Sequence, residues 1–270
     1  MGRLGERFAA LRSRGERALI PFVTAGDPDL ATTEALVLAT AESGADAIEI
    51  GVPFSDPLAE GPTIQRASER ALRSGTSLRR VLELVGDLRP RLELPLVLMG
   101  YENSLYTMGE QAFASAASAV GVDGIIVVDL PPEEGASLFS AAERCGIDPV
   151  LLAAPTTRPE RLEMLAGQTR GFLYYVSLTG VTGARSELSL GIEEVVRSVR
   201  AVSEVPVCVG FGVSTPEHAR RIGEYADGVV VGSALIDRIE AAPSPEAAVD
   251  AVAAFVSELK QPLRQSADSA

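Results

Sequence analysis

Short apolar runs recur along the chain, and an amphipathic segment follows nearly every one of them. Runs of roughly four to eight residues rich in Val, Ile and Phe are typical of strands, and runs that are apolar throughout are typical of parallel strands covered on both faces. The eight predicted strands are Ala18–Thr24, Ala47–Gly51, Leu94–Gly100, Gly124–Val128, Asp148–Ala153, Phe172–Ser177, Val205–Gly210 and Gly228–Gly232.

The segments between these runs predict helices, because their apolar residues recur with helical spacing. Pro132, Pro159 and Pro216 stand in predicted first turns, where the missing N–H of proline is tolerated. One helix opens at Asp29 or Thr32; the others are Thr63–Ser74, Ser77–Leu88, Gly109–Val120, Glu133–Arg144, Pro159–Leu165, Ile192–Ser203, Thr215–Tyr225, Ala234–Ile239 and Pro245–Lys260.

Eight strand–helix units in 270 residues predict an α/β protein with a (β/α)8 TIM-barrel fold, plus an extra N-terminal helix at Leu4–Arg14. We expect one barrel domain over 1–262 and a disordered tail over 263–270. The alternative is an open doubly wound sheet, but no GxGxxG motif follows the first strand and no linker marks a second domain. In a barrel, the chemistry lies where strands end and the following loops begin.

Composition narrows the range of functions. The net charge of −13 disfavours a nucleic-acid partner, and no apolar run is long enough for a membrane span. The charged N-terminal stretch lacks the apolar core of a signal peptide, so we expect a cytoplasmic enzyme. His218 and Lys260 are the only histidine and lysine, and Lys260 lies near the C-terminus. We therefore expect no metal, no Schiff-base lysine and no cofactor.

Carboxylates remain as the candidate catalysts, and Glu49 is the first of them. It interrupts an apolar strand near the end where barrel chemistry takes place. Its neighbours Ile48 and Ile50 should face the helices, so Glu49 should point into the barrel. Apolar surroundings raise the pKa of a carboxyl group and suit it to acid–base work near neutral pH. The alternative is an interior ion pair with an arginine.

Two more acids, Asp56 and Glu60, occupy the turn-rich loop that follows this strand. A second carboxylate facing the first is a layout for proton transfer. Each could equally be a turn former, because Asp56 precedes Pro57 and Glu60 precedes Gly61.

The loops after the last two strands carry glycines where this fold binds phosphate. Gly210, Phe211 and Gly212 end one strand, while Gly232 and Ser233 end the next, before a short helix. The long loop over 178–190, rich in glycine, threonine and serine, has the composition of a lid. Ordinary turns and an ordinary surface loop are the alternatives.

Several motifs, in this order, resemble the family of the tryptophan synthase α subunit. They are PFVTAGDP (21–28), IEIGVPFSDPLAEGPTIQ (48–65), MGYEN (99–103), DLPPEE (129–134), GFLYYVSLTGVTGAR (171–185), VGFGVS (209–214) and ADGVVVGSA (226–234). The resemblance covers roughly Phe8 to Leu259. It implies a TIM barrel that cleaves indole-3-glycerol phosphate to indole and glyceraldehyde 3-phosphate and passes indole to a β subunit.

The resemblance also implies roles for individual residues. Glu49 matches the catalytic acid/base, Glu60 the acid near the indole nitrogen, and Tyr174 a tyrosine beside the active site. The matched substrate- and phosphate-binding residues are Phe22, Thr182, Gly183, Phe211, Gly212, Gly232 and Ser233.

Two positions depart from the family pattern. Glu60 stands where the family has aspartate, and Ser104 where it usually has proline in a region that faces the β subunit. Two alternatives therefore stay open. One is a stand-alone indole-3-glycerol-phosphate lyase that releases free indole. The other is a weakly active barrel that serves as an allosteric partner of a β subunit.

Overall fold

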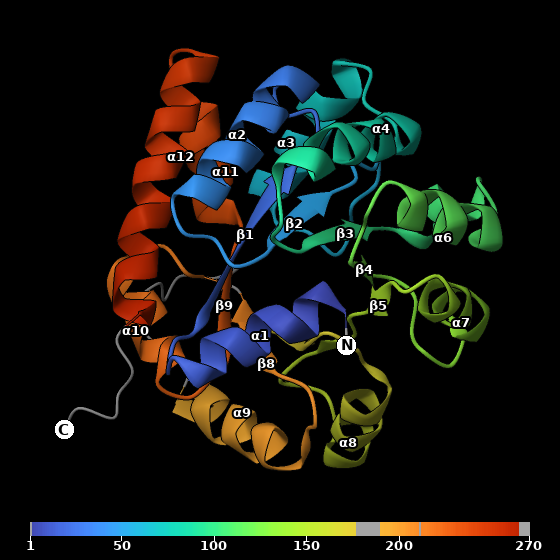
Figure 1. The fold of residues 1–270 in the computed structure, drawn as a ribbon, viewed down its shortest axis with the longest axis vertical. Coiled ribbons are helices and arrows are strands. Elements are labelled where there is room, and N and C mark those ends of the chain that lie inside the picture. Colours follow the sequence, from blue (N-terminus) through green and yellow to red (C-terminus); the bar gives the residue numbers. More distant parts are fainter. Residues whose placement is uncertain (1, 177–189, 211, 265–270) are drawn as a thin grey trace.

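The structure is a computed structural model that describes residues 2–176, 190–210 and 212–264. Its parallel strands form one curled sheet with helices around it (Figure 1). Neighbouring strands follow the order β5-β4-β3-β2-β1-β9-β8-β7-β6. The strands are β1 (Ala18–Thr24), β2 (Ile48–Gly51), β3 (Leu96–Gly100), β4 (Gly124–Val127), β5 (Asp148–Pro149), β6 (Leu152–Ala153), β7 (Leu173–Val176), β8 (Val207–Gly210) and β9 (Gly228–Val231).

β5 and β6 are two parts of the single strand predicted at Asp148–Ala153. β5 pairs with β4 at one edge of the sheet, and β6 pairs with β7 at the other. Because β5 and β6 follow each other directly in the chain, these pairings close the sheet into an eight-stranded barrel. The interruption has a local cause, since the Leu151 N–H donates to the hydroxyl of Thr169 at 3.0 Å and not to a neighbouring strand. The predicted TIM barrel is confirmed.

The helices cover the outside of the barrel (Figure 1). No helix in the described part of the chain combines the length and apolar character needed to cross a membrane. The helices are α1 (Arg3–Ser13), α2 (Leu30–Glu42), α3 (Pro62–Arg73), α4 (Leu78–Leu88), α5 (Glu102–Tyr106), α6 (Glu110–Ala119), α7 (Ala136–Arg144), α8 (Pro159–Gln168), α9 (Leu190–Val202), α10 (Pro216–Gly223), α11 (Ser233–Ala241) and α12 (Pro245–Lys260), with 3-10 turns η1 (Arg89–Arg91) and η2 (Gln261–Leu263).

The ends of several helices differ from the sequence prediction, and two differences change the local structure. The short helix α5, directly after β3, was not predicted. α7 begins at Ala136 and not at Glu133, because the N–H groups of Glu134 and Gly135 both donate to the carbonyl of Pro131 and form a turn. The chain after β4 therefore makes a tight turn before its helix starts.

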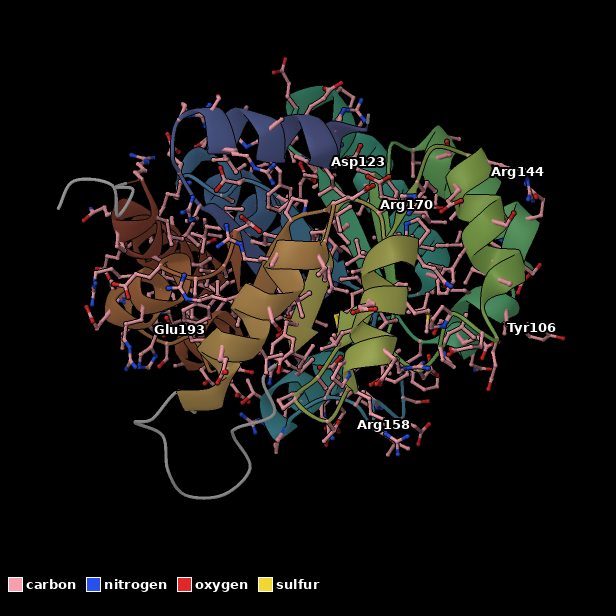
Figure 2. All side chains as sticks on the ribbon, turned by 90° about the horizontal axis from the view of Figure 1, so that it is seen from below. Tyr106, Asp123, Arg144, Arg158, Arg170 and Glu193 are labelled. Carbon is pink, nitrogen blue, oxygen red and sulfur yellow. The ribbon has the colours of Figure 1, made fainter. Side chains whose placement is uncertain are left out.

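α1 closes the end of the barrel where the strands begin. Its residues Leu4, Phe8 and Leu11 are buried in the same cluster as the interior side chains of the strands. The rings of Phe8 and Phe172 lie 5.9 Å apart. Figure 2 shows Asp123 at this end, where it accepts a 2.8 Å hydrogen bond from Arg3 of α1. The predicted N-terminal helix is confirmed, and it covers this end of the barrel interior.

Lys260 is the last residue of α12, as the predicted helix Pro245–Lys260 has it. Its side chain is buried, and its Nζ donates to Asp46 Oδ2 at 2.8 Å and to the Arg17 carbonyl at 3.0 Å. Asp46 also accepts hydrogen bonds from Arg7 and from the N–H of Leu19. The only lysine of the chain therefore fastens the last helix to the start of β1.

Replacing Lys260 by methionine should lower the free energy of unfolding by about 3 kcal/mol, because it leaves the buried Asp46 carboxylate short of a partner. Urea denaturation at pH 7 measures the loss. Arg197→Gln is the matched control, since Arg197 pairs with Glu193 in an exposed ion pair that shares no residue with the Lys260–Asp46 pair. An equal loss of unfolding free energy in the two variants would show that the buried Lys260–Asp46 pair stabilises the fold no more than an exposed ion pair does.

Candidate active site

Glu49 points into the barrel, because residues along a strand alternate between its two faces. Its neighbours Ile48 and Ile50 lie in the core between the sheet and the helices, as expected. Glu49 is 1% exposed, and its Oε2 has no hydrogen-bond partner among the described residues. The alternative of an ion pair with arginine is not observed in this part of the chain.

The pKa of Glu49 is raised to about 8. Burial is the main cause, because the charged form loses its hydration inside the barrel. The negative charge of Glu60 is the second cause, because it repels a second negative charge nearby. Glu49 therefore keeps its proton at neutral pH and can donate it.

Glu60 lies in the loop between β2 and α3 and is half-buried, and burial raises its pKa to about 7. Two hydrogen bonds fix the backbone of this loop. The Ala59 N–H donates to the hydroxyl of Tyr101 at 3.0 Å, and Gln65 Nε2 donates to the Glu60 carbonyl at 2.9 Å. Tyr101 is held in turn by stacking on Phe54, with ring centroids 4.9 Å apart.

Asp56, the other candidate acid, does not join this pair. It is exposed, and its Oδ2 accepts a 2.6 Å hydrogen bond from the hydroxyl of Ser55. Its backbone carbonyl accepts a 2.8 Å hydrogen bond from the Leu58 N–H, which forms the turn that the sequence left open. The structure thus brings Glu49 and Glu60 together and leaves Asp56 outside.

A small cavity of about 10 Å³ lies beside Glu60 in the described part of the site. The ring of Phe22 forms one wall and lies against Gly51, where an added Cβ would stand 2.6 Å from the Phe22 ring. Glycine is therefore required at position 51 for the ring to lie flat on the strand. Tyr101 lines the cavity as well.

Thr24 and Ser68 also line this cavity, and the sequence analysis did not identify them. Both side chains are buried, and the Thr24 hydroxyl has no hydrogen-bond partner among the residues described. Spacing alone could have found them. Thr24 stands two residues after Phe22 on the same strand face, and Ser68 stands one helical turn after Ile64, another cavity residue.

Tyr174 also enters the interior, from β7. The pKa of its hydroxyl is raised well above its usual value, first by burial and then by the charges of Glu49 and Glu60. Its ring lies 6.2 Å from that of Phe172, and an added Cβ at Gly210 would stand 2.4 Å from its hydroxyl oxygen. The absence of a side chain at position 210 thus gives Tyr174 its place, near both carboxylates.

The predicted phosphate loops open at the same end of the barrel. Gly232 is the N-cap of α11, and Ser233 is its exposed first residue. The free N–H groups at a helix N-terminus suit an anion. Gly212 has a φ of +74°, which side chains disfavour. Thr182, Gly183 and Phe211 lie outside the described residues.

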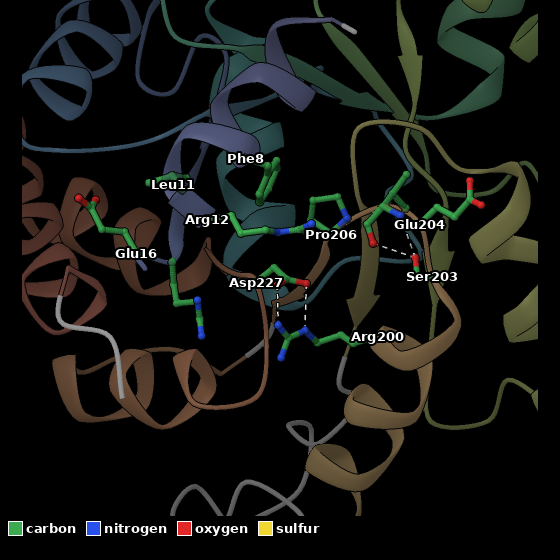
Figure 3. Close-up of a pocket in the computed structure, with 11 residues that line it drawn as sticks. Phe8, Leu11, Arg12, Glu16, Arg200, Ser203, Glu204, Pro206 and Asp227 are labelled. Atoms are coloured by element: carbon green, nitrogen blue, oxygen red, sulfur yellow. Dashed lines mark hydrogen bonds and ion pairs between the residues drawn. The ribbon is translucent and has the colours of Figure 1, made fainter. Parts of the chain in front are cut away.

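A larger cavity, of about 320 Å³, lies at the opposite end of the barrel between α1 and the end of α9 (Figure 3). Its main charged pair is satisfied, because Arg200 binds both carboxylate oxygens of Asp227 at 3.0 and 2.7 Å. Phe8 and Pro206 form part of its lining. No predicted site residue within the described ranges lines this cavity, so volume alone does not locate the chemistry.

Comparison with known families agrees with this geometry. A family model described as tryptophan synthase alpha chain matches residues 8–264. The chain belongs to the tryptophan synthase alpha chain family. The family predicted from the sequence motifs is therefore confirmed, with nearly the same extent.

The tryptophan synthase alpha chain of Geobacter sp. (strain M21) is 53% identical over 261 residues, which cover 97% of each chain. The solved subunit alpha from Legionella pneumophila str. Paris is 40% identical, with a TM-score of 0.89 and coverage of 97% of this chain and 98% of that one. A structure of Mycobacterium tuberculosis tryptophan synthase in space group F222 also has 40% identity and a TM-score of 0.89, over 98% and 99% of the two chains.

Because the pKa of Glu49 is raised, the stability of this member of the tryptophan synthase alpha chain family should depend on pH. Between the usual 4.5 and the folded value of about 8, the unfolded chain loses the proton that the folded chain keeps. The free energy of unfolding should therefore fall as pH rises through this window, by up to about 1.4 kcal/mol per unit of pKa difference.

Glu49→Gln removes this dependence and should be more stable than the unsubstituted chain at pH 8, with little difference at pH 4. Urea denaturation at both pH values measures the effect. Asp56→Asn, in the exposed part of the loop, is the control and should show no such pH-dependent gain. A Glu49→Gln gain that is equal at both pH values would contradict the assignment.

Proposed function

We propose that the chain cleaves indole-3-glycerol phosphate to indole and glyceraldehyde 3-phosphate. The observation that carries the proposal is a protonated, buried Glu49 with a second carboxylate, Glu60, at the open end of the barrel. Membership of the family supports the choice of substrate. The roles of the individual residues follow from their positions and are part of the proposal.

The reaction is a retro-aldol cleavage in which the indole ring accepts the electrons. Glu49 donates its proton to C3 of the indole and forms an indoleninium cation. A proton then leaves the hydroxyl next to C3, its oxygen becomes the aldehyde carbonyl, and the bond from this carbon to C3 breaks. The bonding pair returns to the ring and restores aromaticity. Glu49, now a carboxylate, takes the hydroxyl proton and is ready for the next cycle.

Glu60 stabilises the positive charge that develops on the ring N–H. Its pKa is lower than that of Glu49, so it ionises first. Two carboxyl groups whose pKa values are pushed apart divide the roles of acid and anion between them. The single charge of ionised Glu60 also helps to keep Glu49 protonated.

The phosphate of the substrate binds at the N-terminus of α11, beside Gly232 and Ser233, with Gly212 from the neighbouring loop. Phe22 spans the two parts of the site, because its ring lies against Gly51 and within 3.5 Å of an added Cβ at Gly232. This supports a binding mode in which the indole ring lies near the carboxylates while the phosphate reaches the glycine loops. Phe211, Thr182 and Gly183 complete the proposed phosphate and lid contacts.

A β subunit is the proposed protein partner, as in tryptophan synthase. Two exposed apolar side chains at the mouth of the barrel support a partner surface. Leu58, in the Glu60 loop, is 90% exposed, and Tyr106, at the end of α5, is 69% exposed. Figure 2 shows Tyr106 pointing outward from the molecule. The segments that carry Leu58 and Tyr106 are also joined beside the carboxylates, because the Ala59 N–H donates to the hydroxyl of Tyr101. A partner on this surface can therefore act on Glu60.

Indole release from indole-3-glycerol phosphate by the purified chain, with and without a β subunit, tests the proposal. Glu49→Gln should lower kcat by about 10²- to 10⁴-fold, because it removes the proton donor. Binding of glycerol 3-phosphate, measured by calorimetry, should stay unchanged. Turnover by Glu49→Gln at the rate of the unsubstituted chain would show that Glu49 is not the acid/base.

The β subunit arm of the same assay separates the alternatives. Strong stimulation supports the synthase subunit, whereas fast release without β supports a stand-alone lyase. A chain that binds the β subunit and alters its activity without releasing indole would be an allosteric partner. No indole under either condition would contradict both lyase functions.

The pH profile should report the two carboxyl groups. Activity should rise as Glu60 ionises near pH 7 and fall as Glu49 loses its proton near pH 8, with apparent values that belong to the coupled pair. Glu60→Gln should lose the rising limb and about 10²-fold in kcat. Glu60→Asp, which keeps the charge, should retain more activity than Glu60→Gln; the reverse order would exclude a role for the charge.

A further inference from the structure

The loop that carries Glu60 runs directly into α3, and the proposed phosphate-binding turn at Gly232 runs directly into α11. These two helices pack against each other on the outside of the barrel. The position of α3 relative to α11 therefore determines how far Glu60 lies from the phosphate.

One face of α3 belongs to the site. Ile64 and Ser68 line the cavity beside Glu60. Gln65, on the same helix, holds the backbone carbonyl of Glu60 at 2.9 Å. A shift of α3 would consequently move both a wall of the cavity and the carboxylate.

The adjacent face of α3 is bonded to α11 by charged side chains. Arg66 donates to both carboxylate oxygens of Glu240, with its shortest distance 2.7 Å. The hydroxyl of Thr63 donates to Asp237 at 3.1 Å. These α3 side chains recur at a helical spacing, so they form one stripe against α11.

Arg70 is the next residue of this stripe and joins a third segment. Its Nη1 binds Glu240 at 2.7 Å, while its Nε and Nη2 bind the two oxygens of Asp27 at 2.7 and 2.9 Å. Asp27 lies in the loop after β1 and is 1% exposed. One guanidinium thus connects the loop after β1, the helix after the Glu60 loop and the helix that begins at Ser233.

We propose that Arg70 is a positioning residue that fixes Glu60 relative to the phosphate-binding end of α11. The inference rests on the proposed function, because it assumes that the phosphate and the reacting ring occupy these two places. Arginine suits the task, since its planar fork reaches two carboxylates in a fixed geometry that lysine cannot reproduce. Small errors in the distance between a bound handle and a catalytic group are costly in rate.

The same network lets phosphate binding act on the catalytic loop. A phosphate at the N-terminus of α11 restrains that helix, and the restraint passes through Glu240 and Arg70 to α3 and the Glu60 loop. Binding energy from the unreactive end of the substrate is thereby used at the reacting end.

Two conservative variants test the proposal without emptying a buried site, namely Arg70→Lys and Glu240→Gln. Each should lower kcat about tenfold or more, while glycerol 3-phosphate binds as tightly as before or more tightly, because its binding energy is no longer used to order the Glu60 loop. The pH limb assigned to Glu60 should shift or broaden in both. Arg73→Gln is the matched control, because Arg73 lies on the same helix and, among the residues that the structure describes, pairs only with Glu69, in an exposed bridge of 3.4 Å.

Hydrogen exchange supplies a readout that does not need turnover. Glycerol 3-phosphate should slow exchange of the amides over 55–61 in the unsubstituted chain and in Arg73→Gln, but not in Arg70→Lys or Glu240→Gln. Unchanged kcat and unchanged loop protection in both variants would overturn the proposal, as would a parallel loss of kcat and phosphate affinity. An unsubstituted chain that releases no indole but shows the phosphate-dependent protection would refute the proposed reaction and leave the coupling standing.

Discussion

A carboxyl group inside an apolar barrel is the constraint on which the rest of this structure depends. Glu49 has no cation beside it among the described residues, so the protein stabilises its neutral form and raises its pKa to about 8. The surroundings of Glu49 must stay apolar, because an unpaired carboxylate is costly to bury without water. The surrounding strands, Phe22 and the loop of Glu60 all serve this purpose.

The opposite end of the barrel treats its carboxylates differently. Asp46, Asp123 and Asp227 each lie just before a strand, and each accepts a backbone N–H at the start of a neighbouring strand, from Leu19, Leu96 and Val207 respectively. Each is also paired with basic side chains, among them Lys260, Arg89 and Arg200. The cations balance the negative charges of these acids, and the ion pairs stabilise the fold. This difference between the two ends agrees with a barrel that carries out its chemistry at the carboxyl ends of the strands and is stabilised at their amino ends.

The barrel and the inward position of Glu49 could be predicted from the sequence, because both follow from the periodicity of apolar residues. Alternation along β2 placed Glu49 inside, and the order of apolar runs predicted the barrel. The interruption at Leu151 was not readable, because it depends on a hydroxyl eighteen positions along the chain, at Thr169. The reach of Arg70 was hidden for the same reason, since its partners Asp27 and Glu240 meet only when the barrel has closed.

The interruption between β5 and β6 also divides the molecule in a second way. One buried core contains residues from 23 to 147, all before it. Another contains mainly residues from 151 to 263, together with a few from β1, α2 and α3. At this point the Val150 N–H still donates to β4 and the Leu151 carbonyl still accepts from β7, but the Leu151 N–H is bonded to the side chain of Thr169. We expect the two sides to unfold as separate cooperative units, with the barrel opening along the seam between them before either side loses its own core.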